Sequence, residues 1–181
     1  MTEPTTSEPS SRRNLVLGLA LLAPVLLLVY AGLYDSWFLR DDFMWLRDAQ
    51  RQWDDPTRFW TTRPSGYLRP VSNLFFGLEY AVFGLTATGY LVVNALLHLT
   101  NACLLAALLR ALGAPLRLAL AAAACAGLMV TASPGVVWIS DIVSLLALGF
   151  VLAAALFHRR HVTGGRLVDG ILAVSCVALA A

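Results

Sequence analysis

Long apolar runs with almost no charge are the feature that most constrains the fold of this chain. Five runs follow one another, at residues 15–34, 90–112, 118–130, 136–157 and 168–181. A helix of about 20 apolar residues can cross the hydrocarbon core of a bilayer. Only 13% of the 181 residues are charged, against about a quarter in a soluble domain. The sequence therefore predicts an all-α, polytopic transmembrane helical bundle of about four to five spans.

The placement of arginine predicts which ends of these helices face the cytoplasm. Residues 1–13 are rich in Ser, Thr, Pro and Glu and are expected to form a disordered cytoplasmic tail. With that tail inside, the inner turns carry Arg12, Arg13, Arg110, Arg117, Arg159, Arg160 and Arg166. The turn around Ser133, on the other side, carries no basic residue. This asymmetry obeys the positive-inside rule and favours a cytoplasmic N-terminus.

The last run is about 14 residues, which is short for a membrane crossing. It is expected either to pair with a partner or to be cut short because the sequence is the front of a longer protein. We favour truncation. The predicted organisation is then a tail at 1–13 and a membrane domain at 14–181, whose first external loop covers residues 35–89.

The first break between apolar runs, residues 35–67, differs in character from the rest of the chain. It is densely charged and holds Trp37, Trp45, Trp53 and Trp60. Because tryptophan favours the membrane–water boundary, this segment is expected to form short amphipathic helices along the surface. The stretch 67–85 carries Asn73 and Glu79, so it predicts an interfacial or re-entrant helix, separated by a turn at 84–89 from the next span.

Candidate chemistry begins with the adjacent carboxylates of Asp41 and Asp42, just beyond the first span. A carboxylate beside the membrane surface can act as a general base toward a hydroxyl. Burial and the neighbouring carboxylate are both expected to raise the pKa of one of the pair. The alternative is that both cap an interfacial helix in water. Arg63 and Arg69, with Arg40, could bind an anionic group bidentately, or could pair with local aspartates.

Polar residues inside the apolar runs form a second group of candidates. Asn94, His98 and Asn101 share one helical face, which is expected to look into the bundle. His98 is then either a helix–helix hydrogen-bonding group or a functional residue. Asp141, near the outer end of its run, either reaches the interface or points into an outward-facing cavity. The three cysteines lack metal-ligand spacing, and the sequence leaves metal dependence open.

Three stretches, in order, resemble the N-terminal part of the GT-C class of membrane glycosyltransferases. The first is Arg-Asp-Asp-Phe at 40–43, and the second is the pattern Tyr-Leu-Arg-Pro at 67–70 continuing into Gly-Tyr at 89–90 and on to His98. The third runs from Ser-Pro at 133–134 to Trp138 and Asp141. The resemblance covers about residues 12–160. It is closest to the protein O-mannosyltransferase-like and TMTC-like branch and its bacterial relatives.

The resemblance implies an enzyme that moves a sugar, such as mannose, from a polyprenyl-phosphate donor to a protein or glycan acceptor at the external membrane face. It implies membrane lipid as surroundings, no nucleic-acid partner, and the bacterial inner membrane as location. Asp41 or Asp42 would be the catalytic base. The candidates for binding donor phosphate or acceptor are Arg40, Arg69, Asp141 and His98.

The chain also departs from that family. The second external loop is shorter and lacks the His and Glu that relatives carry between the Pro and the Trp, which leaves open any metal or acceptor role of this loop. Further spans of the family are missing, so this chain alone is expected to be inactive. A non-catalytic membrane protein, such as an assembly subunit or a small transporter, is therefore the second hypothesis.

Overall fold

The computed structural model describes residues 8–33, 36–129 and 138–180. Throughout these residues the regular structure is helical, and no strand occurs among them. The α-helices of this part are α1 (Glu8–Tyr30), α2 (Asp42–Asp54), α3 (Arg58–Thr61), α4 (Pro70–Phe83), α5 (Ala87–Ala111), α6 (Leu116–Leu128), α8 (Ile142–Gly164) and α9 (Leu167–Ala180). The predicted all-α class is confirmed.

Three helices are long and apolar enough to cross a membrane. They are Arg13–Tyr30 within α1, Ala87–Ala111 (α5), and Ile139–Gly164, which joins a short 3-10 turn to α8. The other two predicted spans correspond to α6, with 13 residues, and α9, with 14 residues. At 1.5 Å per residue such helices are about 20 Å long, shorter than the ~30 Å hydrocarbon core. The described helices therefore support three spans by length, fewer than the predicted four to five.

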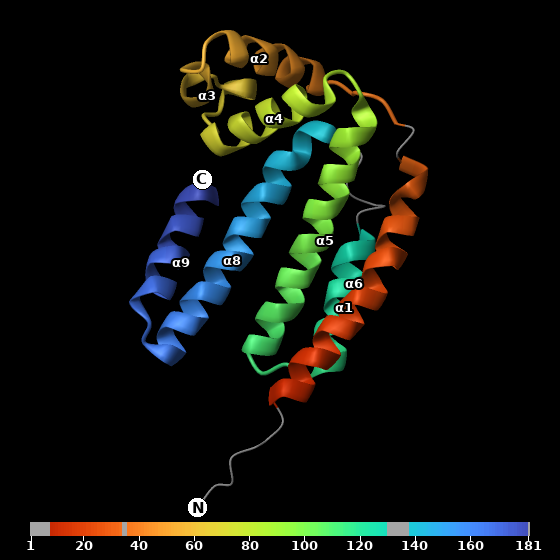
Figure 1. Ribbon diagram of the computed structural model, residues 1–181, viewed down its shortest axis with the longest axis vertical. Helices are drawn as coiled ribbons and strands as arrows, with labels where there is room; N and C mark the ends of the chain where they lie inside the picture. Colours follow the sequence, from red (N-terminus) through yellow and green to blue (C-terminus); the bar gives the residue numbers. More distant parts are fainter. Residues whose placement is uncertain (1–7, 34–35, 130–137, 181) are drawn as a thin grey trace, which may run out of the picture.

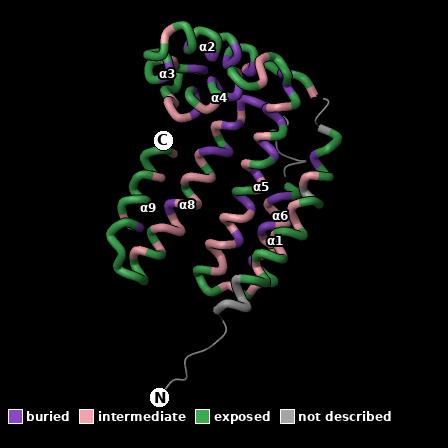
Figure 2. Tube along the Cα trace, in the orientation of Figure 1, coloured by how far each residue is buried: buried purple, intermediate pink, exposed green. Residues whose placement is uncertain are grey.

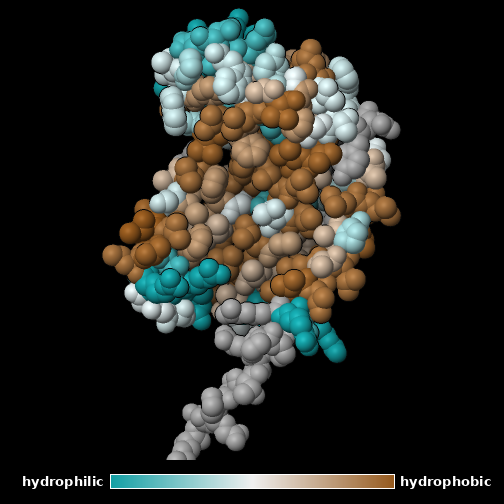
Figure 3. Space-filling model, in the orientation of Figure 1, coloured by the Kyte–Doolittle hydropathy of each residue, from teal (hydrophilic) through white to brown (hydrophobic). Residues whose placement is uncertain are grey.

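The helices form a bundle with a cap at one end (Figure 1). α8 packs between α5 and α9, while α6 and α1 lie on the other side of α5. α2, α3 and α4 lie across the end of the bundle farthest from the N-terminus. In the face shown in Figure 3, an apolar band covers the bundle and hydrophilic residues gather at its two ends, as expected for a membrane protein.

Burial is greatest where the cap meets the bundle (Figure 2). Aromatic rings fill this junction: Tyr90 of α5 lies 5.4 Å from Phe38 and 5.3 Å from Phe76, ring centroid to centroid. Trp45 of α2 packs on Phe76 and is buried, although we expected it at the interface. The other three tryptophans of this segment, Trp37, Trp53 and Trp60, are exposed, and their placement at the membrane interface stays a prediction. Packing against α4 and α5 explains why Trp45 differs.

The helix predicted within 67–85 is present as α4, and its interfacial or re-entrant placement stays a prediction. The turn after it covers residues 84–86, shorter than the predicted 84–89, because α5 begins at Ala87. α4 begins at Pro70, which suits the first helical position because it lacks an N–H. It ends at Phe83, and the following Gly84 has a φ of 55°, which is readily accessible to glycine. The Tyr90 hydroxyl donates a 2.8 Å hydrogen bond to the Gly84 carbonyl and so holds the turn against α5.

The polar face of α5 looks into the bundle, as predicted. Asn94 donates to the carbonyl of Ile139 (3.2 Å), and Asn101 donates to the carbonyl of Leu145 in α8 (2.9 Å). His98 Nε2 lies 3.2 Å from the carbonyl oxygens of both Ala126 and Gly127 in α6. These bonds join three helices inside the apolar band.

The N-terminal boundary differs from the sequence prediction. α1 begins at Glu8, so residues 8–13 of the predicted tail are helical. The rest of that tail, residues 1–7, lies outside the described residues. So does most of the turn around Ser133, at 130–137.

Candidate functional site

The Asp42 carboxylate is the polar link between the cap and α8. It is fully buried, and its two oxygens accept hydrogen bonds from two backbone N–H groups. Oδ2 accepts from Leu39 N (2.8 Å), and Oδ1 accepts from Ser140 N (2.7 Å). Ser140 is 98 residues farther along the chain. Asp42 therefore fixes the segment before α2 to the start of α8, a structural role that leaves its carboxylate buried.

Burial raises the pKa of Asp42 above its ordinary value, and this is the largest effect on it. The hydrogen bonds from Leu39 and Ser140 oppose the shift, while the charge of Asp41 adds a smaller increase. The prediction that one carboxyl of the pair has a raised pKa is confirmed. The main cause of the raised pKa is removal from water, because the Asp42 carboxyl is buried between α2 and the start of α8.

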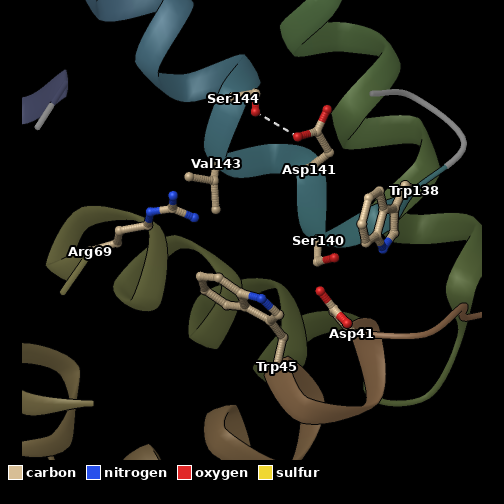
Figure 4. A pocket seen from close by; sticks show the side chains of 8 residues that line it. All are labelled: Asp41, Trp45, Arg69, Trp138, Ser140, Asp141, Val143 and Ser144. Carbon is tan, nitrogen blue, oxygen red and sulfur yellow. Dashed lines mark hydrogen bonds between the residues drawn. The ribbon is translucent and has the colours of Figure 1, made fainter. Parts of the chain in front are cut away.

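Asp41, by contrast, lies beside a small open pocket (Figure 4). Its side chain makes no cap hydrogen bond to α2, and no described residue donates to its carboxylate. The pocket has a volume of about 120 Å³. It is lined by Asp41, Trp45, Arg69, Trp138, Ser140, Asp141, Val143 and Ser144. The two adjacent aspartates thus have different environments: one is a buried link, and the other has a free carboxylate.

Three helix N-termini meet at this pocket. Asp41 is the N-cap residue of α2, Arg69 that of α4, and Asp141 that of α8. All three side chains line the pocket although they come from distant parts of the sequence. A helix N-terminus carries partial positive charge and unpaired N–H groups, so it favours bound anions. The lining of the pocket therefore combines three helix N-termini with one cation, Arg69, and two carboxylates, Asp41 and Asp141.

Arg69 adds a full positive charge to one side of the pocket, across from Asp41 in Figure 4. Its guanidinium carbon lies 5.0 Å from the centre of the Tyr67 ring, a cation–π contact that steadies the side chain. Arg69 makes no salt bridge to any described aspartate or glutamate. Its donors therefore remain available for a ligand.

Asp141 faces the same pocket but has one internal partner. Its Oδ1 accepts a 2.6 Å hydrogen bond from the Ser144 hydroxyl, one turn later in α8. The side chain is half-buried at the outer end of the span. The structure shows that Asp141 lines a pocket at this end of the helix, and whether that pocket faces outward stays a prediction.

Two predicted site residues lie elsewhere. Arg40 is exposed, has a φ of 43°, and does not line the pocket. His98 lies well inside the bundle with its ring nitrogen on carbonyls of α6, which is the helix–helix role left open by the sequence. Neither lines the pocket beside Asp41.

Trp45, Trp138 and Ser140 also line the pocket, although the sequence did not predict them as site residues. Trp45 follows Asp41 by four positions, so a helix starting at Asp42 places both on one face, and that spacing was a usable signal. The Trp138 Nε1 group is buried and has no partner among the described residues, which leaves a donor for a bound group. No local signal in the sequence links Ser140 to Asp42.

The described residues contain no group of three or more His, Cys, Asp or Glu side chains arranged to hold a metal ion. No protein-family model, curated protein or solved structure matches this chain.

Proposed function

We propose that this chain is a GT-C-type membrane glycosyltransferase, or the N-terminal part of one. It would transfer a sugar from a polyprenyl-phosphate donor to an acceptor at the external membrane face. The observation that carries the proposal is the free carboxylate of Asp41 in a pocket where three helix N-termini and Arg69 converge. This arrangement offers a base and an anion site within one small cavity.

The reaction would use the two sides of the pocket differently. Asp41 accepts the proton of the acceptor hydroxyl as that oxygen forms a bond to the anomeric carbon of the sugar. The bond between this carbon and the phosphate oxygen breaks, and the electron pair leaves with the polyprenyl phosphate. Arg69 and the helix N-termini stabilise the growing negative charge on the phosphate. Asp42 keeps Asp41 in place by fixing the start of α2 to α8.

The proposed topology places this pocket outside the cell. The basic residues of the described helical turns, including Arg110, Arg117, Arg159, Arg160 and Arg166, belong to the ends opposite the cap. The positive-inside rule assigns those ends to the cytoplasm. α6 and α9 would then return the chain to the outer side, in line with the predicted four to five spans. In a bacterium, the membrane would be the inner membrane.

Sugar transfer by the full-length protein in membranes tests the proposal. Radiolabelled polyprenyl-phosphate mannose and glucose serve as donors, with total membrane protein and glycan as acceptors. Asp41→Asn keeps the size of the side chain but cannot take the proton, so transfer is expected to fall roughly 100-fold or more. Asp54→Asn, at an exposed aspartate of the same helix, is the matched control and should leave transfer unchanged.

A properly inserted protein that transfers sugar equally well with Asp41→Asn would remove Asp41 as the base. If the full-length protein is folded and membrane-inserted but transfers neither sugar, the result would favour the second hypothesis, a non-catalytic membrane protein.

A further inference from the structure

The structure holds a second buried acidic group, Glu79 on α4, in a different place from the pocket of Asp41. Glu79 is ten residues beyond Arg69, so it lies about 15 Å farther along α4. Its side chain is only 5% exposed, and both of its carboxyl oxygens are buried without a hydrogen-bond partner among the described residues. Leaving such a group unpaired costs stability, so its surroundings point to a ligand.

Glu79 lines an apolar cavity of about 200 Å³ between α4 and α5. The remaining lining residues are Phe75, Leu78, Val82, Phe83 and Val93. For comparison, an apolar cavity of roughly 150 Å³ takes up benzene. The space next to Glu79 is therefore large enough for a hydrocarbon segment, and Glu79 is the single polar group that the cavity lining offers it.

The surface around the cavity is apolar. Leu78 and Val82, at its rim on α4, are exposed apolar residues, and so are Val92 and Leu96 on the adjoining α5. α5 is one of the helices long enough to span the membrane. A molecule dissolved in the bilayer could therefore enter without crossing a polar surface.

The protonation state of Glu79 decides which polar group fits. Burial raises its pKa to about 9, so the carboxyl is neutral at pH 7. A neutral carboxyl has one O–H donor and one free carbonyl acceptor. A hydroxyl group, which also donates and accepts, satisfies both at once. An ammonium ion would require Glu79 to lose its proton, and a phosphate would find no positive charge in the lining.

We infer that Glu79 and the cavity between α4 and α5 form a binding site for an uncharged, hydroxyl-bearing aliphatic molecule of the bilayer. The hydrocarbon part lies against Phe75, Val82 and Val93, and the hydroxyl exchanges hydrogen bonds with the Glu79 carboxyl. This site does not depend on the proposed glycosyl transfer, because it shares no lining residue with the pocket of Asp41.

Dodecanol, dodecane and dodecylamine are matched probes for this site in the purified full-length protein. The apolar reagent dicyclohexylcarbodiimide modifies protonated carboxyls in apolar surroundings, so its rate of reaction at Glu79, followed by peptide mass spectrometry, reports an open site. We expect Glu79 to react with the reagent. Dodecanol should slow this reaction roughly tenfold, which corresponds to the free energy of about one hydrogen bond. Dodecane should have little effect. Equal protection by dodecane, better protection by dodecylamine, or no reaction at Glu79 would each overturn the inference.

Two variants test the hydroxyl contact without the reagent. Glu79→Gln keeps one donor and one acceptor and should retain bound dodecanol in native mass spectrometry. Glu79→Leu fills the position with hydrocarbon and should lose it, while thermal melting checks that both variants fold. Equal dodecanol binding by Glu79→Leu and Glu79→Gln would show that the carboxyl does not recognise the hydroxyl.

Discussion

At the scale of single residues, the adjacent aspartates at 41 and 42 divide two tasks between them. The Asp42 carboxylate accepts hydrogen bonds from two backbone N–H groups and is fully buried, whereas Asp41 lines the pocket. The sequence predicted the pair but could not rank its members, because the difference depends on Ser140, 98 residues away. A contact at that separation leaves no local pattern.

Replacing Asp42 with Asn should lower the stability of the fold. The amide keeps one acceptor oxygen but turns an N–H₂ group toward a backbone donor, so one buried N–H loses its partner. The expected cost is about 1–3 kcal/mol in the free energy of unfolding. Thermal melting of the detergent-solubilised protein measures it, with Asp54→Asn as the exposed control. Equal melting temperatures for the two variants would mean that Asp42 does not link the cap to α8.

Glu79 should make stability depend on pH. Its pKa is about 9 in the folded protein and 4.5 when solvated, so the folded state binds the extra proton between these values. Stability contributed by neutral Glu79 is fully present below pH 4.5 and is lost as pH rises toward 9. Between pH 4.5 and pH 7 the free energy of unfolding is expected to fall by roughly 3 kcal/mol. The Glu79→Gln variant should therefore be more stable than the wild type near pH 8. Its free energy of unfolding should not fall with pH in this way. Parallel stability curves for the two proteins from pH 5 to 8.5 would contradict the assignment.

At the scale of helices, polar side chains and glycines set how closely α5 and α8 approach. Asn101 donates to the Leu145 carbonyl, and Gly149 lies against the same side chain. A Cβ at Gly149 would be 2.8 Å from Asn101 Oδ1. The sequence predicted that the polar face of α5 looks inward from the spacing of Asn94, His98 and Asn101, and the structure confirms it. The sequence could not predict which helices supply the acceptor carbonyls, because the neighbours of a helix depend on how the loops connect it to the others.

Gly149→Leu should force α5 and α8 apart, because there is no room for the side chain beside Asn101. Overpacking of this kind costs about 1–3 kcal/mol. The control is Gly164→Leu in the same helix, where an added Cβ meets nothing within 4 Å, and its effect should stay within about 0.5 kcal/mol. Thermal melting compares the two variants. A similar change in both variants would show that contact with Asn101 does not limit position 149.

At the scale of the whole molecule, the apolar runs predicted where the helices lie, and the number of spans stays a prediction. α1, α5 and α8 meet the length required for crossing. α6 and α9 have 13 and 14 residues, and residues 130–137 after α6 and residue 181 after α9 lie outside the described residues. The cap was predictable as surface helices from its charge and tryptophans. Its packing over the bundle, with Trp45 inside, was not.

The topology can be tested by cysteine accessibility in intact cells. In a protein with Cys103, Cys125 and Cys176 changed to Ala, Gln50→Cys on the cap and Leu112→Cys at the α5–α6 turn provide two exposed positions. A membrane-impermeant maleimide should label position 50 from outside and should reach position 112 only after the cells are opened. The reverse pattern would place the cap, and the pocket of Asp41, in the cytoplasm.

The central claim is that Asp41, and not Asp42, takes the proton in sugar transfer at the pocket where three helix N-termini meet. The direct test is the initial rate of transfer from a polyprenyl-phosphate sugar by full-length Asp41→Asn, normalised to the amount of folded protein. The account predicts a rate at least about 100-fold below wild type with an unchanged melting temperature. A normalised rate equal to that of the wild type would contradict it.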